Sequence, residues 1–93
     1  MASGIIKKAP RTLRQQETVN VTGNPSDWVY VDVVFNIPYE SAPLVVVHAP
    51  YDTGSSTNWY PAMVKNITST GFTFGWYNVT GSKTVLWQAI GII

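Results

Sequence analysis

The chain of 93 residues contains no cysteine and few charged residues. The lack of cysteine excludes disulfide bonds, thiolate metal ligands and cysteine nucleophiles. A chain of this length buries only a modest share of its unfolded surface, so a single small domain is marginally stable without a staple or a partner. Because disulfides are excluded, we expect self-association to supply the additional stability.

Charge is scarce and unevenly placed. Charged residues make up 12% of the chain, and the formal net charge is +1. Four of the six cations lie in the first fourteen positions, which leaves Lys65 and Lys83 in the body against five carboxylates. Nucleic-acid binding needs a stripe of cations that neutralises phosphates. The body lacks such a stripe, so we expect no nucleic-acid partner.

Long hydrophobic runs are also missing. A membrane-spanning helix needs about 20 consecutive apolar residues, and no segment approaches that length. The N-terminus lacks the apolar core of a signal peptide, because Ile5 and Ile6 are followed at once by Lys7 and Lys8. We therefore expect no membrane partner and synthesis in the cytoplasm.

The chain divides into an arm and a body. Met1 to Gln15 has no apolar periodicity and holds the clustered cations, which predicts a flexible N-terminal arm. Residues 16–93 alternate apolar and polar side chains with a period of two, which is typical of β-strands. Six strands with no convincing helix indicate an antiparallel sandwich or barrel. They are expected at Glu17–Thr22, Trp28–Phe35, Leu44–Val47, Ala62–Thr68, Gly71–Tyr77 and Lys83–Gly91.

Two strands carry apolar side chains that need a partner. Leu44–Val47 is a continuous apolar run, which predicts a central strand buried on both sides or a strand at an oligomer interface. Trp28 and Tyr30 fall on the more polar face of their strand, where we expect interface packing in an oligomer. Trp87 lies on the final strand and is expected in the core.

The sequence does not favour an enzyme. His48 is the single histidine and follows a buried run, where a hydrogen-bonded strand-end residue is the expected role. The five carboxylates have no spacing that pairs them for glycosidase chemistry or a calcium site. Phosphate-binding loops and nucleophile elbows are also missing. We expect no catalytic residue, metal or cofactor.

Polar and aromatic residues gather in two places that suit carbohydrate. Sugars bind through aromatic faces, which cover their C–H groups, and through amides, hydroxyls and carboxylates. The stretch from His48 to Tyr60 is a long loop, and long loops often carry function. Trp59 and Tyr60 could instead tuck under the sandwich or into a subunit interface. The candidate ligand-binding residues are Asp52, Asn58, Trp59 and Tyr60 in the loop and Trp76, Tyr77 and Asn78 at the end of the fifth strand.

Five segments in order resemble the H-type lectin domain. They are Phe35, Pro38-Tyr39, Ala42–Val47, Asn66–Phe72 and Trp87–Gly91, and the similarity extends over about Val29 to Gly91. The form is most similar to the variant at the C-terminal ends of bacteriophage tail fibres and tail-associated proteins. The resemblance implies a six-stranded antiparallel β-sandwich that assembles as a homotrimer.

The sugar site of animal H-type lectins carries over poorly. It uses an acidic loop residue, an Arg on the fourth strand and a Trp-His pair after the fifth. Asp52 matches the acid, whereas the other positions fall near Ala62 to Val64 and at Val79 and Thr80. The resemblance therefore implies a scaffold without a defined sugar specificity.

Two functions follow as hypotheses. The first is a virion tail-associated or fibre-tip domain that binds host cell-wall saccharide without catalysis, weakly at each site and multivalently overall. The alternative is a structural phage component of the same fold that binds only other phage tail proteins.

Overall fold

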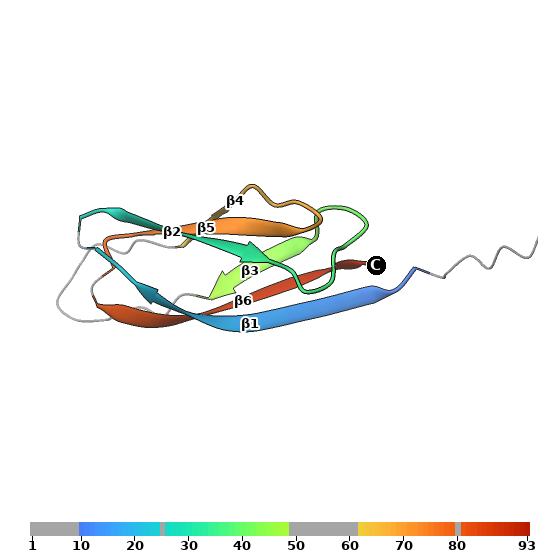
Figure 1. Ribbon diagram of the computed structural model, residues 1–93, viewed down its shortest axis with the longest axis horizontal. Helices are drawn as coiled ribbons and strands as arrows, with labels where there is room; N and C mark the ends of the chain where they lie inside the picture. Colours follow the sequence, from blue (N-terminus) through green and yellow to red (C-terminus); the bar gives the residue numbers. More distant parts are fainter. Residues whose placement is uncertain (1–9, 25, 49–61, 80) are drawn as a thin grey trace, which may run out of the picture.

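The computed structural model describes residues 10–24, 26–48, 62–79 and 81–93, in which six strands form two antiparallel sheets of three strands. One sheet has the order β1–β6–β3 and the other β2–β5–β4, and the two face each other as a sandwich (Figure 1). This confirms the predicted all-β, six-stranded antiparallel sandwich. The strands are β1 (Thr12–Thr22), β2 (Trp28–Val34), β3 (Leu44–His48), β4 (Met63–Lys65), β5 (Gly71–Tyr77) and β6 (Ser82–Ile92). No helix of the described ranges is long and apolar enough to cross a membrane.

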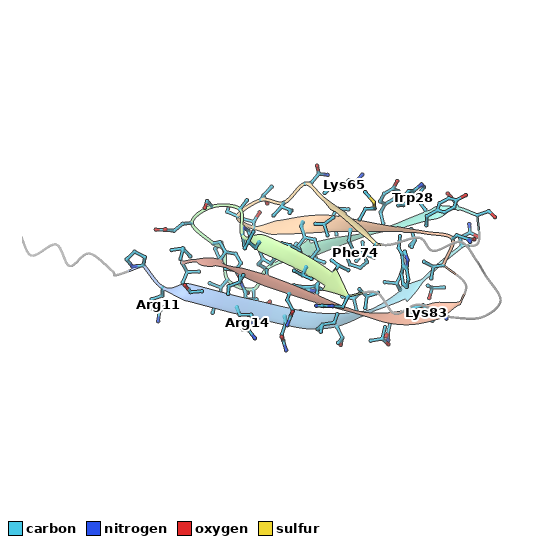
Figure 2. The ribbon with its side chains drawn as sticks, turned by 180° about the vertical axis from the view of Figure 1, so that it is seen from behind. Arg11, Arg14, Trp28, Lys65, Phe74 and Lys83 are labelled. Carbon is cyan, nitrogen blue, oxygen red and sulfur yellow. The ribbon has the colours of Figure 1, made fainter. Side chains whose placement is uncertain are left out.

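The core lies between the two sheets and is aromatic. Phe74 on β5 and Val85 on β6 are fully buried, and Figure 2 shows Phe74 between the layers. Phe35, Phe72 and Trp87 contact one another, with ring centroids 5.6 to 5.8 Å apart. The expected core position of Trp87 is confirmed, since it is 3% exposed. Alternation explains this core, because every second residue of each strand points inward.

Of the two environments predicted for the third strand, the structure contradicts the first, a central strand buried on both sides. Among the described strands β3 pairs with β6 alone, so it is an edge strand of its sheet and not a central one. Val45 and Val47 point inward and are half-buried, whereas Leu44 and Val46 are 74% and 50% exposed. The prediction of burial on both sides is therefore wrong for the isolated chain. The other prediction, an oligomer interface, stays open.

The arm is shorter than predicted. β1 begins at Thr12, and the backbone from Thr12 to Gln15 pairs with β6. Leu13 packs against the core. The Gln15 side chain donates Nε2–H to the Ile37 carbonyl at 2.8 Å and accepts from the Ile37 N–H at 3.1 Å. The boundary after Gln15 is therefore wrong, because a mostly polar edge strand shows little apolar periodicity. Residues 1–9 of the predicted arm lie outside the described residues.

Removing the start of β1 should destabilise the domain. Deletion of residues 1–15 takes away the Leu13 contact, the paired Gln15 bonds and the Leu13 carbonyl that accepts from the Tyr39 hydroxyl at 3.0 Å. We expect a loss of about 2–4 kcal/mol in the free energy of unfolding, measured by urea denaturation. Deletion of residues 1–9 is the control and should change little. Equal urea midpoints for the two truncations would contradict the role of this segment.

The fourth strand is also shorter than predicted. β4 ends at Lys65, and Asn66 adopts a left-handed φ of 55° that breaks the extended backbone. The Thr68 N–H donates to the Gly71 carbonyl at 2.8 Å, which turns the chain into β5. A Cβ on Gly71 would lie 2.1 Å from the Val33 carbonyl oxygen, so glycine is needed where β5 meets β2.

Candidate functional site

Three aromatic side chains gather on the outer face of the β2–β5–β4 sheet. Trp28 and Tyr30 are outward residues of β2, and their exposed fractions are 41% and 56%. Tyr77, at the end of β5, is half-buried and pairs with Trp28. The Trp28 and Tyr30 rings are nearly parallel, with centroids 6.1 Å apart and planes at 12°, and the Tyr77 ring lies 5.4 Å from Trp28. We call Trp28, Tyr30 and Tyr77 the aromatic platform.

A glycine in the middle of the sheet makes room for these rings. Gly75 on β5 pairs with Tyr30 on one side and Met63 on the other. A Cβ on Gly75 would lie 2.9 Å from Cε1 of Tyr30 and 3.4 Å from Cε3 of Trp28. Because Gly75 has no side chain, the Tyr30 and Trp28 rings can rest against the β5 backbone.

A row of polar side chains borders the platform. Asp32 of β2, Thr73 of β5 and Lys65 of β4 occupy one register across the sheet. The Thr73 hydroxyl donates to Oδ1 of Asp32 at 2.6 Å. The Lys65 ammonium lies 4.5 Å from the centroid of the Tyr30 ring, within cation–π range. Figure 2 shows Lys65 and Trp28 on the same outer side of the sandwich.

The turn before β2 fixes the base of the platform. Oδ1 of Asp27 accepts from the Trp28 N–H at 2.7 Å, and the Asp27 carbonyl accepts from the Asn78 N–H at 2.9 Å. Oδ1 of Asn78 in turn accepts from the Ser26 N–H at 2.8 Å. Ser26 and Asn78 both have a φ of 62°, a conformation that Asn adopts more readily than most residues. These contacts hold the start of β2 against the end of β5.

The structure separates the three predicted site residues at the end of the fifth strand. Trp76 points inward and is 5% exposed, so its ring belongs to the core. Tyr77 points outward and belongs to the platform, because successive strand residues alternate between faces. Asn78 supports the turn through Ser26. The four loop candidates, Asp52, Asn58, Trp59 and Tyr60, lie outside the described residues.

The structure adds residues to the candidate site that sequence analysis did not place there. Trp28 and Tyr30 were expected at an interface, and Asp32, Thr73 and Lys65 were not singled out. Alternation along β2 puts Trp28, Tyr30 and Asp32 on one face. Thr73 and Lys65 join this face because β2 and β4 both pair with β5 around Gly75. This pairing cannot be predicted from the pattern within a single strand.

The opposite outer face, on the β1–β6–β3 sheet, has a different character. Leu44 and Ile90 are paired across β3 and β6, and both are exposed. Val46 and Ile92 lie beside them, at 50% and 39% exposed. We call Leu44, Val46, Ile90 and Ile92 the apolar face. Polar side chains lie next to the apolar face on the same sheet. Nε2–H of Gln88 donates to Oε1 of Gln16 at 2.8 Å, and Nε2 of His48 lies 3.4 Å from Oε1 of Gln88.

The described residues contain no group of three or more His, Asp or Glu side chains that could hold a metal ion. His48, the single histidine, is exposed at the end of β3 beside Gln88. In the part of the chain that the structure describes, the aromatic platform and the apolar face are therefore the surfaces with functional potential.

Solved structures with the same fold include phage tailspikes and pyocin tail fibres. The tailspike gp61 of Pseudomonas phage phi297 is 22% identical over 86% of this chain, with a TM-score of 0.65. An N-truncated R1-type pyocin tail fibre is 21% identical over 86% of the chain, with a TM-score of 0.65. The tailspike gp49 of Pseudomonas phage LKA1 is 22% identical over 87%, with a TM-score of 0.61. At this identity the likeness establishes a shared fold.

The matched region is a small part of the tailspikes. The chain spans 15% of the phi297 and LKA1 tailspikes and 70% of the truncated pyocin fibre. None of these structures is named as an H-type lectin, so that resemblance stays a prediction. No protein-family model and no curated protein sequence matches the chain.

Proposed function

We propose that this domain is a tail-fibre or tailspike module that binds host-surface saccharide at the aromatic platform. The observation that carries the proposal is the pair of exposed, nearly parallel rings of Trp28 and Tyr30 beside a polar row. The fold shared with phage tailspikes and pyocin tail fibres supports the tail-associated part of the proposal.

The platform has the chemistry that sugars require. The C–H groups of a pyranose ring stack on aromatic faces, which lose unfavourable contact with water in the process. Asp32 supplies an acceptor, and Lys65 supplies a donor for sugar hydroxyls. Trp and Tyr lose little conformational freedom on binding, so they suit a site that binds weakly and is present in several copies.

The proposed module is non-catalytic and uses no cofactor. Among the described residues, the two carboxylates nearest to the platform are Asp27 and Asp32, five residues apart along extended backbone, which is about 16 Å. A glycosidase pair is separated by about 5 to 10 Å. Asp32 is hydrogen-bonded to Thr73, and Asp27 to the backbone of Trp28. We assign both carboxylates to binding and to support of the platform.

The proposal includes self-association, with a trimer as the expected state. The apolar face would leave four hydrophobic side chains in water on an isolated domain, and Leu44 alone is 74% exposed. Burial of such a face between copies stabilises a small domain that has no disulfides. This arrangement leaves the aromatic platform, on the opposite sheet, free for ligand.

The alternative function is a structural phage component that binds other tail proteins. The apolar face also favours this alternative, since it suits any protein partner. The two functions differ at the platform. Retention of the purified protein on immobilised bacterial surface polysaccharide supports saccharide binding. Failure of the folded protein to bind a broad panel of such polysaccharides favours the structural role.

Charge on the apolar face should dissociate the oligomer. We expect the wild-type protein to be a trimer at tens of micromolar by light scattering, and Leu44→Glu to shift it towards monomer, because a buried unpaired carboxylate is costly. Val34→Glu is the matched control, since Val34 is 78% exposed on the other sheet. A monomeric wild-type protein, or a trimer unaffected by Leu44→Glu, would contradict this part of the proposal.

A further inference from the structure

We infer that the aromatic platform selects an uncharged saccharide longer than one sugar ring, with Lys65 donating and Asp32 accepting at its edge. The inference rests on the proposed function and adds the class of the ligand. It follows from the charges on this face, from the geometry of Lys65 and Asp32, and from the length of the binding surface.

The charges around the platform disfavour an acidic ligand. Asp32 borders it with a carboxylate, which balances the single ammonium of Lys65. Carboxylate, phosphate and sulfate groups are bound best by the fork of an arginine. Figure 2 shows Arg11 and Arg14 on the opposite side of the sandwich from Lys65 and Trp28. A uronate or phosphorylated sugar would therefore meet the Asp32 carboxylate, no net positive charge, and no arginine among the described residues of this face.

Lys65 and Asp32 together match a neutral hydroxyl. The Lys65 ammonium is attracted to the Tyr30 ring at 4.5 Å, and it still has N–H groups to donate. Asp32 uses Oδ1 to accept from Thr73, and its carboxylate has further acceptor sites. Sugar hydroxyls both donate and accept, so the hydroxyls of one saccharide can use both groups. An anionic group only accepts, and Asp32 would repel it.

The aromatic platform and Asp32 together form a surface that is longer than one sugar ring. Trp28, Tyr30 and Asp32 succeed one another on the outer face of β2. Asp32 is four positions beyond Trp28 along the extended strand, which is about 13 Å. One sugar can stack on Trp28 while the next lies by Tyr30, with its hydroxyls at Lys65 and Asp32. We therefore expect oligosaccharides to bind more tightly than their monosaccharides.

Tetrasaccharides of different charge test the inference. The 93-residue protein is titrated with neutral tetrasaccharides of glucose, galactose, mannose, rhamnose or N-acetylglucosamine and with tetragalacturonate. Tryptophan fluorescence reports binding. We expect at least one neutral chain to bind about tenfold more tightly than tetragalacturonate. Its Kd should change less than about twofold between about 50 and 500 mM salt, since no ion pair with the ligand is formed.

Variants of Lys65 test the polar edge. Lys65→Met keeps a long side chain without the donors, and should weaken the neutral ligand about three- to tenfold. Lys65→Arg keeps the donors and the ring contact and should bind within about twofold of wild type. Arg14→Gln, on the opposite face, is the control and should have no effect. Unchanged binding by Lys65→Met would overturn the role of Lys65.

The outcomes separate the inference from the function on which it rests. Tighter binding of tetragalacturonate, weakened by salt, would overturn the neutral ligand and leave saccharide binding intact. A folded wild-type protein that binds no chain of the panel would overturn both.

Discussion

Phe74→Ala should destabilise the domain severely, with a loss of about 3–5 kcal/mol in the free energy of unfolding. Phe74 is fully buried in the middle of β5 and packs against Phe72, with ring centroids 6.4 Å apart. Removal of the ring leaves a cavity between two sheets that are fixed by their own hydrogen bonds and cannot collapse into it. A domain of this size has little stability in reserve, so the melting temperature should fall by roughly 15 °C or more.

Val34→Ala is the matched control for Phe74→Ala. Val34 ends β2 in the same sheet and is 78% exposed, so its loss should cost less than about 1 kcal/mol. Thermal unfolding followed by circular dichroism gives both values. Similar melting temperatures for the two variants would mean that the core does not lie between the sheets at Phe74.

Trp28→Ala should abolish measurable binding to a saccharide-coated surface. Loss of a central aromatic contact costs about 1–3 kcal/mol at each site, or roughly five- to 150-fold in affinity. Several copies of the site in one oligomer multiply this loss in apparent affinity. The Trp28 ring is 41% exposed and contacts only the other platform rings, Tyr30 and Tyr77, among the aromatic side chains that the structure describes. Because it lies outside the core, folding should be retained. Surface plasmon resonance on immobilised polysaccharide measures the effect, with circular dichroism as the folding check.

Two further variants locate the site. Trp28→Phe keeps a stacking ring and should bind better than Trp28→Ala. Trp59→Ala tests the loop that the sequence predicts as a ligand surface together with Asp52 and Tyr60. Normal binding by Trp28→Ala and lost binding by Trp59→Ala would move the site from the platform to that loop.

Alternation made most of the fold predictable. In β2, Val29, Val31 and Val33 alternate with Trp28, Tyr30 and Asp32, so the apolar face of this strand could be assigned without a structure. The predicted first strand begins too late, at Glu17 in place of Thr12, because the polar run Arg14–Glu17 has no apolar periodicity. The first residues of β1 are held by backbone pairing with β6 and by the Gln15 bonds to Ile37, which are long-range contacts that a local pattern does not reveal.

The candidate site was less predictable, because it depends on register between strands. Trp76, Tyr77 and Asn78 are neighbours along the chain and were predicted as one cluster, whereas alternation turns Trp76 inward and Tyr77 outward. Tyr77 instead meets Trp28, a residue 49 positions away that pairs with it across β2 and β5. The requirement for glycine at position 75 can be recognised only when the structure shows that the Tyr30 ring packs against its backbone.

Nuclear magnetic resonance of the tryptophan indole N–H groups tests most directly whether the aromatic platform binds saccharide. The chain has four tryptophans, and Trp76 and Trp87 are buried. The cross-peak of Trp28 is assigned by its loss in Trp28→Phe, and that of Trp59 in Trp59→Phe. On titration with a neutral oligosaccharide we predict that the Trp28 cross-peak moves with saturation while those of Trp76 and Trp87 stay in place. A Trp28 cross-peak that stays fixed while the saccharide binds would contradict the account.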